Sequence, residues 1–143
     1  IEGSIHQDLL RGNDLANVIS GGAGHDMLSG GHGNDTLTGG TGSDSFEFGY
    51  GEGADIITDL TTEDVIRLRG YGSVQSITQV GDDVVIVLTN TDRITCLQTD
   101  VATVESVLWF NPSPPPPPPP PPPASTLLPP TPAAPGEPNT GLI

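Results

Sequence analysis

The amino-acid sequence predicts an all-β fold, in which a stacked repeat is followed by antiparallel strands and a proline-rich tail. Three observations support this prediction. A nine-residue motif recurs in tandem near the start, stretches rich in Val, Ile and Thr alternate with turn residues in the middle, and all 16 prolines lie beyond residue 111. We therefore divide the 143 residues into a Gly/Asp-rich repeat region (1–53), a strand-rich region (54–111) and a tail (112–143).

The repeat is clearest in three adjacent blocks, GGAGHDMLS (21–29), GGHGNDTLT (30–38) and GGTGSDSFE (39–47). Each block has Gly at positions one, two and four, Asp at position six and a large apolar residue at position eight. Two weaker copies precede them, GSIHQDLLR (3–11) and GNDLANVIS (12–20). A flexible Gly/Ser linker would not hold Asp and apolar residues in nine-residue register, so we interpret the region as five structured turns.

Each copy predicts a tight glycine turn followed by a three-residue strand with one inward side chain. Glycine allows the positive φ angles of such a turn, and positions seven to nine alternate polar, apolar, polar. A strand this short buries almost nothing alone, so it must stack on its copies. If two copies make one coil, one wall stacks Leu10, Leu28 and Phe46, and the other stacks Ile19 and Leu37.

The same period sorts the position-six residues onto two edges. Asp8, Asp26 and Asp44 fall on one edge, and Asn17 and Asp35 on the other. Carboxylates one strand spacing apart, about 4.8 Å, repel each other, and a divalent cation between them makes the net electrostatic interaction attractive. Carboxylate and carbonyl oxygens are hard ligands of the kind that Ca²⁺ prefers.

These blocks resemble the RTX calcium-binding nonapeptide, GGxGxDxUx. The resemblance implies a right-handed parallel β-roll that binds about three to four Ca²⁺ ions between turns two repeats apart. Carried over to this sequence, the paired side chains are Asp8 with Asp26, Asn17 with Asp35, and Asp26 with Asp44.

The resemblance also implies backbone ligands from the glycine turns. Their carbonyls belong to Gly21, Gly22, Ala23, Gly24, Gly30, Gly31, His32, Gly33, Gly39, Gly40, Thr41 and Gly42. Two departures weaken the first coil, because Asn17 is neutral where Asp is usual and His6 replaces the fourth-position glycine. We expect the sites that involve those turns to be looser or empty.

After Phe46 the nine-residue spacing slips by two residues. The segment resembles the exit segment of the RTX family (F-x-F, then G-x-G-x-D-x-I), although Leu60 stands where an aromatic residue is common. The resemblance implies that Asp55 binds a last Ca²⁺ against the turn of Asp35, with Asp59 nearby. The alternative is a solvated acidic turn.

The remaining strand-rich region predicts a cap for the exposed end of the roll. Strands are predicted over 64–69, 74–80, 83–89, 93–97 and 104–110. Turn residues at 81–83 and 90–92 favour antiparallel hairpins. A stacked roll has an open edge that needs covering, and this region resembles the cap that follows RTX repeats in many secreted bacterial proteins.

The tail contains ten consecutive prolines (114–123), which predict a polyproline II rod of about 31 Å that serves as a spacer to another domain. The alternative is a ligand for an SH3-type groove, although no Lys or Arg follows Arg93. Residues 124–143 have no periodicity and are predicted to be disordered or to lead into a next domain.

Charge and composition exclude several classes of function. The chain has 18 acidic residues, four arginines and no lysine, which argues against nucleic acid or an anionic membrane as a partner, and no apolar run is long enough to span a membrane.

The single Cys96 cannot form an internal disulfide and is expected to be buried and inert. His6, His25 and His32 fall at different turn positions and should not converge on zinc, and Trp109 is predicted in the cap core. No nucleophile elbow or zinc-protease helix motif is present.

The leading hypothesis is a non-enzymatic, calcium-dependent folding module of a larger secreted bacterial protein. At cytosolic Ca²⁺ the acids repel and the chain stays unfolded, which suits export by type I secretion, as the RTX resemblance implies. The chain begins at Ile1 without a signal-peptide pattern, and we interpret it as a piece of a longer protein.

The alternative is a Ca²⁺-dependent carbohydrate-binding module, since similar rolls are attached to polysaccharide-acting enzymes, including alginate epimerases. The outward positions disfavour direct contact with an anionic polymer because they are small and mostly neutral: Val18, Ser20, Met27, Ser29, Thr36, Thr38 and Ser45.

Overall fold

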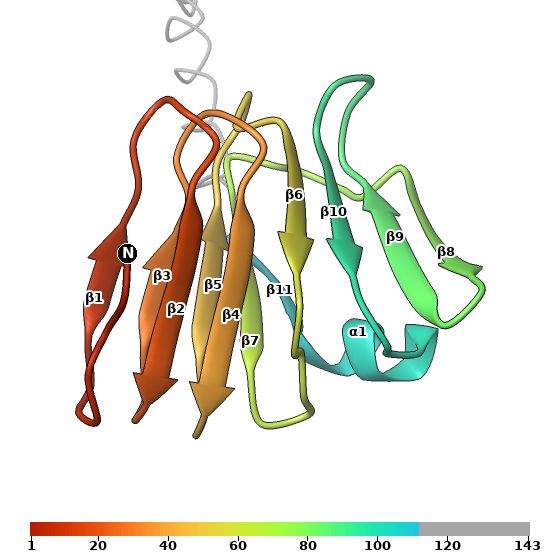
Figure 1. The fold of residues 1–143 in the computed structure, drawn as a ribbon. Helices are drawn as coiled ribbons and strands as arrows, with labels where there is room; N and C mark the ends of the chain where they lie inside the picture. Colours follow the sequence, from red (N-terminus) through yellow and green to blue (C-terminus); the bar gives the residue numbers. More distant parts are fainter. Residues whose placement is uncertain (112–143) are drawn as a thin grey trace, which may run out of the picture. The chain divides into compact units, whose positions relative to one another are not determined.

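The computed structural model describes residues 1–111, which form eleven strands and one helix arranged as a two-walled β-roll with a cap (Figure 1). The first sheet has the order β1 (Leu9–Arg11), β3 (Met27–Ser29), β5 (Ser45–Phe48), β7 (Val65–Arg69) and β11 (Leu108–Asn111). The second sheet has the order β2 (Val18–Ala23), β4 (Thr36–Thr41), β6 (Ala54–Ile57), β10 (Arg93–Cys96), β9 (Asp83–Val87) and β8 (Ser76–Val80). The predicted polyproline rod and tail lie outside the described residues.

The two walls arise because successive strands β1 to β7 alternate between the sheets, so that each strand pairs in parallel with the strand one full coil away. Leu28 is in register with Leu10 on one side and with Phe46 on the other, and Ile19 is in register with Leu37. Four of these five side chains are fully buried, while Leu10 is half-buried in the first strand. The predicted parallel β-roll and its apolar stacks are therefore confirmed.

Strands β6 and β7 extend the walls by another coil. Ile57 pairs with Leu37, and Ile66 pairs with Phe46, so equivalent residues are 20 positions apart here and 18 positions apart in the preceding coils. Phe46 and Ile57 are 11 positions apart, whereas Ile57 and Ile66 are again nine positions apart, so the two additional residues lie in the turn between β5 and β6. Only that turn is longer than a nonapeptide turn.

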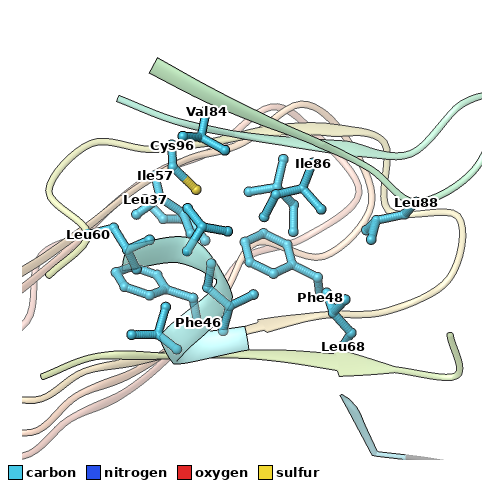
Figure 2. Close-up of a cluster of buried hydrophobic side chains, with 14 of the residues drawn as sticks. Leu37, Phe46, Phe48, Ile57, Leu60, Leu68, Val84, Ile86, Leu88 and Cys96 are labelled. Carbon is cyan, nitrogen blue, oxygen red and sulfur yellow. The ribbon is translucent and has the colours of Figure 1, made fainter. Parts of the chain in front are cut away.

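The cap joins the roll at both sheets. Strand β10 pairs in parallel with β6 and antiparallel with β9, β9 pairs antiparallel with β8, and β11 pairs in parallel with β7. Val84, Ile86 and Cys96 of the cap lie over the roll side chains Phe46 and Phe48 in one buried cluster (Figure 2). The cap therefore covers the end of the apolar stacks, and burial raises the pKa of the Cys96 thiol to about 12, which keeps it in the inert thiol form.

The strand predicted over 104–110 is partly wrong. Helix α1 spans Val101–Val107, and only the following four residues form β11. Asp100 is the N-cap of this helix, and its carboxylate accepts the backbone N–H of Thr103 at 2.7 Å. The buried residues Val104 and Val107 lie three positions apart, on one face of the helix. The β-branched composition favoured a strand, but the helix cap and tertiary burial decided the outcome.

Candidate metal sites at the two edges of the roll

The turns of the roll lie along two edges. The first edge contains the turns that lead into β1, β3, β5 and β7, and the second edge contains the turns that lead into β2, β4 and β6. A positive φ occurs at the second and fourth glycines of the three strict blocks, for example 100° at Gly40 and 126° at Gly42. The predicted glycine turns are therefore formed, and they place the position-six residues of successive coils next to one another.

On the first edge, each Asp carboxylate accepts a hydrogen bond from the equivalent residue of the preceding coil. Oδ1 of Asp26 accepts the backbone N–H of Asp8 at 2.8 Å, and Oδ1 of Asp44 accepts that of Asp26 at 2.9 Å. Oδ1 of Asp64 continues the series by accepting the N–H of Asp44 at 2.8 Å. Asp64 was missed in the sequence, although it follows Asp44 by the same 20 residues that separate Asp35 from Asp55.

The second edge repeats the arrangement. Oδ1 of Asp35 accepts the N–H of Asn17 at 2.7 Å, and Oδ1 of Asp55 accepts the N–H of Asp35 at 2.9 Å. The predicted pairs Asn17 with Asp35 and Asp35 with Asp55 are thus brought together. The side-chain amide of the neutral Asn17 donates to Leu15 O and to Asp35 Oδ1. In this pair, therefore, only Asp35 can contribute a negative charge.

The surroundings of the second carboxylate oxygens of Asp26 and Asp35 are suited to a bound cation. Both Oδ2 atoms are buried and have no hydrogen-bond partner, and the two residues are only 2% and 1% exposed. An ionised oxygen buried in this way is costly unless a counter-charge compensates it. The first glycine of each block leaves room for this oxygen, since a Cβ on Gly21 would stand 2.5 Å from Asp26 Oδ2.

Several predicted backbone ligands lie in the gap between stacked turns. The carbonyl oxygens of Gly22, Gly24 and Gly33 face glycines of the following coil so closely that an added Cβ would collide with them. The carbonyl of Thr41, in contrast, already accepts the N–H of Gly24 at 2.9 Å. Within residues 1–111, no three His, Cys, Asp or Glu side chains are grouped to hold a metal ion, so any cation here must draw on backbone oxygens.

The carboxylates at the two ends of the first edge are satisfied by the protein itself. Oδ2 of Asp8 accepts the N–H of Ser4 at 2.6 Å and its hydroxyl at 2.8 Å. Oδ2 of Asp64 accepts the N–H of Thr61 at 2.7 Å and its hydroxyl at 2.9 Å. On this edge, the buried carboxylate oxygen without a hydrogen-bond partner belongs to the interior residue Asp26.

Asp59 lies at the first edge and not beside Asp55, which is at the opposite end of β6. Its two carboxylate oxygens accept the N–H groups of Gly39 and Gly40 at 2.9 and 2.7 Å. Asp59 therefore closes the preceding glycine turn, and its placement next to Asp55, expected from the sequence, is wrong.

Asp92 is a further buried carboxylate, in a segment whose sequence indicates only a turn. It accepts the N–H of Gly51 at 3.0 Å and the hydroxyl of Tyr71 at 3.0 Å, and it is 3% exposed. Burial disfavours its charge, but the hydrogen bonds from Gly51, Thr89 and Tyr71 outweigh burial and lower its pKa. Asp92 thus ties the cap to the last turn of the second edge without a metal.

The carboxylates of Asp55 and Asp44, in contrast, have raised pKa values. Burial, with added repulsion from Asp35, Glu52 and Asp92, raises the pKa of Asp55 to about 7. Burial also raises the pKa of Asp44, with smaller contributions from neighbouring carboxylates. The turns therefore contain more negative charge than the polypeptide around them stabilises.

His25 and His32 lie at different edges, because Nδ1 of His25 lies 3.0 Å from the backbone nitrogen of Ser43 at the first edge and Nδ1 of His32 lies 2.9 Å from Gly51 O at the second.

No helix within residues 1–111 has the length and apolar character needed to cross a membrane.

Comparison with known proteins agrees with this geometry. Residues 11–46 match the model of the RTX calcium-binding nonapeptide repeat in four copies, so this part of the chain consists of calcium-binding repeats of the RTX type. No curated protein sequence gives a significant match to the chain.

Two solved structures have a similar fold. One is the AlgE6R2 subunit of the Azotobacter vinelandii mannuronan C5-epimerase, with a TM-score of 0.56 and 24% identity over 80% of this chain and 94% of that one. The other is the extracellular lipase LipA from Serratia marcescens, with a TM-score of 0.51 and 21% identity over 74% of this chain. The match spans only 20% of the lipase, so the similarity concerns the fold of one region of that enzyme.

Proposed function

We propose, from the premise that residues 11–46 are RTX calcium-binding repeats, that this chain is a non-enzymatic module that folds when it binds Ca²⁺. In this proposal it serves as the secretion, folding and stabilising region of a larger exported protein. The observation that carries the proposal is the buried, unpartnered Oδ2 of Asp26 and of Asp35, one at each edge of the roll.

The proposed ligands are the paired position-six side chains together with carbonyls of the glycine turns. The pairs are Asp8 with Asp26, Asp26 with Asp44, Asn17 with Asp35, and Asp35 with Asp55. Bound Ca²⁺ supplies the positive charge that these turns lack, and about three to four ions would occupy the roll. The sites of Asp8 and Asn17 are proposed to be the weakest, because Ser4 already satisfies Asp8 and Asn17 carries no charge.

The link between binding and folding follows from the size of the strands. The strands β1 to β6 contain three to six residues each, and most contribute one or two buried side chains. Such strands cannot offset their loss of conformational entropy while the turns repel one another. Ion-binding free energy therefore becomes folding free energy. Circular dichroism with and without Ca²⁺ tests this coupling, and equal folding in both would contradict it.

Export by type I secretion is part of the proposal because low cytosolic Ca²⁺ would keep the chain unfolded for passage, and Ca²⁺ outside the cell would then fold it. The similarity to an extracellular lipase supports a location outside the cell.

Acidification is expected to replace part of the Ca²⁺ requirement. In the metal-free roll the pKa of Asp55 is raised to about 7 and that of Asp44 is raised, so protonation favours the folded state and its stability falls as the pH rises toward 7. In EGTA we expect more β structure at about pH 5 than at about pH 8. Below about pH 4 the lowered pKa of Asp92 acts in the opposite direction. Circular dichroism at fixed ionic strength measures this, and a β signal that falls between pH 8 and pH 5 would contradict it.

A second candidate function is Ca²⁺-dependent binding of a carbohydrate, favoured by one surface of the first sheet. A cleft of about 490 Å³ is lined by Arg11, Ser29, Glu47 and Arg69, among other polar residues. The register from β1 to β11 puts Arg11, Glu47 and Trp109 in the same cross-strand row. This face is therefore less neutral than the sequence suggested.

Trp109 is 51% exposed, with the guanidinium of Arg67 lying 5.8 Å from its ring centroid, so its predicted place in the cap core is wrong. An exposed indole offers a stacking surface for a sugar ring. Affinity electrophoresis on alginate and on neutral glycans, with Ca²⁺ present, tests this second candidate. Retardation that is lost in Trp109→Ala is expected, and unretarded migration on every glycan would exclude it.

A further inference from the structure

We propose that Asp92 is a positioning residue for the cation site between the turns of Asp35 and Asp55, at the cap end of the second edge. Its carboxylate does not bind the ion. It holds the last glycine turn of this edge in the place that a following coil gives to the interior turns. The proposal rests on the calcium function proposed above and adds to it a residue of the cap, outside the repeats.

The last turn of the second edge has the sequence YGEGAD (50–55) and lacks the first glycine of the motif. Counted back from its aspartate at position six, Gly51 and Gly53 are the second and fourth positions, and their φ angles are 81° and 107°. The equivalent glycines of the preceding turn, Gly31 and Gly33, have φ angles of 93° and 124°. The last turn therefore shares the positive φ angles of the strict blocks.

Interior turns are held by the coil that follows them. The N–H of the fourth-position glycine donates to the third-position carbonyl of the next coil. At the first edge Gly24 donates in this way to Thr41 at 2.9 Å. At the second edge Gly33 donates to Glu52, also at 2.9 Å. The last turn has no such neighbour, because the next strand of the second sheet is β10 of the cap, so its glycine N–H groups need an acceptor from elsewhere.

Asp92 supplies that acceptor. Its Oδ1 accepts the N–H of Gly53 at 3.3 Å, and its Oδ2 accepts the N–H of Gly51 at 3.0 Å. The hydroxyl of Tyr71 lies 3.0 Å from the same Oδ2 and 2.8 Å from the carbonyl oxygen of Gly49. One buried carboxylate of the cap therefore fixes both glycines of the last turn, and Tyr71 fixes that carboxylate.

The placement of the last turn decides where its oxygens lie relative to Asp35. Oδ1 of Asp55 accepts the N–H of Asp35 at 2.9 Å, while Oδ2 of Asp35 is buried without a hydrogen-bond partner. A cation at that oxygen needs further oxygens from the last turn, and Ca²⁺ affinity depends on how rigidly they are held. Loss of an outer partner that orients metal ligands typically costs about 10–100-fold in affinity. Asp92 acts on the ion through the turn, as such a partner.

Asp92→Asn is the direct test, because it replaces one acceptor oxygen by a donor amide group. Asp82→Asn is its control, since it changes the same charge at an exposed position of the cap. Equilibrium dialysis measures Ca²⁺ binding at concentrations where circular dichroism shows the roll to be folded. We expect Asp92→Asn to weaken the binding of one ion about ten-fold and to leave the other ions unchanged. Asp82→Asn should bind every ion as the unmodified chain does.

Tyr71→Phe separates position from charge. The charge of Asp92 disfavours ionisation of Asp55, so Asp92→Asn alters the charge near the site as well as the turn. Tyr71→Phe removes one hydrogen bond to Asp92 and keeps its charge. We expect it to weaken the same ion by a smaller factor, whereas Tyr50→Phe, which removes the hydroxyl of an exposed ring, should have no effect. Unchanged affinity for every ion in Tyr71→Phe would assign the effect of Asp92 to its charge and overturn the positioning role.

A role confined to the stability of the fold gives a different result. Asp92→Asn would then lower the urea midpoint of unfolding, while the folded protein bound the same number of ions with unchanged affinity. That result would also overturn the positioning role and leave the calcium module intact. If Asp92→Asn does not fold at saturating Ca²⁺, Tyr71→Phe decides the question, because it retains the carboxylate. Absence of Ca²⁺ binding by the unmodified chain would instead overturn the calcium function itself.

Discussion

Removal of Ca²⁺ is expected to abolish most of the β structure of residues 1–111, and its return should restore that structure. The interior turns bury carboxylates whose second oxygens have no partner in the protein, and the short strands between them depend on turn stacking for their register. Without a cation, repulsion between the turns and the entropy of the glycine-rich chain both favour the unfolded state. Far-ultraviolet circular dichroism in EGTA, followed by Ca²⁺ titration, measures the transition.

Two controls separate ion binding from general screening. Sodium chloride at equal ionic strength should restore little structure, because salt screens exposed charges far better than buried ones. Mg²⁺ should be less effective than Ca²⁺, since it requires stricter octahedral geometry and keeps its water ligands. Equal β structure in EGTA and in Ca²⁺ would show that the roll folds without ions and would remove the basis of the proposed function.

Substitution of Gly40 by alanine is expected to destabilise the roll strongly even at saturating Ca²⁺. Gly40 has a φ of 100°, and an added Cβ would collide with the carbonyl oxygen of Gly22 in the facing turn. The unfavourable backbone conformation alone costs about 1–3 kcal/mol, and displacement of the turn adds to it. The free energy of unfolding from urea titration, and the Ca²⁺ midpoint of folding, measure the effect.

Gly72→Ala is the matched control for this substitution. Gly72 is exposed and has no heavy atom within 4 Å of an added Cβ, so its replacement should change the unfolding free energy by less than about 0.5 kcal/mol. Equal stabilities of Gly40→Ala and Gly72→Ala would mean that the turns are not packed as closely as described.

The period of the sequence accounts for the roll because the same interactions repeat in each coil. A nine-residue spacing of Gly, Asp and apolar residues is enough to predict that Leu28 stacks between Leu10 and Phe46 and that Ile19 stacks on Leu37, and the strand register confirms both. It also places Asp26 beside Asp44, since any residue that keeps the period meets its equivalent one coil later.

The features that were missed or wrong lie where the period ends. The turn between β5 and β6 is two residues longer than a nonapeptide turn, Asp64 follows it, and Asp92 reaches the second edge from the cap, 39 residues after Gly53. Helix α1 and the exposure of Trp109 depend on which surface of the roll the cap covers. No local pattern encodes the contact of Asp92 or the surface that the cap covers.

By itself, therefore, the sequence determined the coil, the inward stacks and the two acidic edges, because each follows from spacing along the chain. The tertiary structure alone decided which carboxylate oxygens are satisfied and which are left without a partner. Ser4 and Thr61 satisfy the ends of the first edge, Asp92 is held by Tyr71 and a glycine turn, and Asp35 and Glu52 retain buried free oxygens. The physical reason is that hydrogen bonding and burial of a carboxylate depend on neighbours from other coils and from the cap, whose distance in space is unrelated to their separation in sequence.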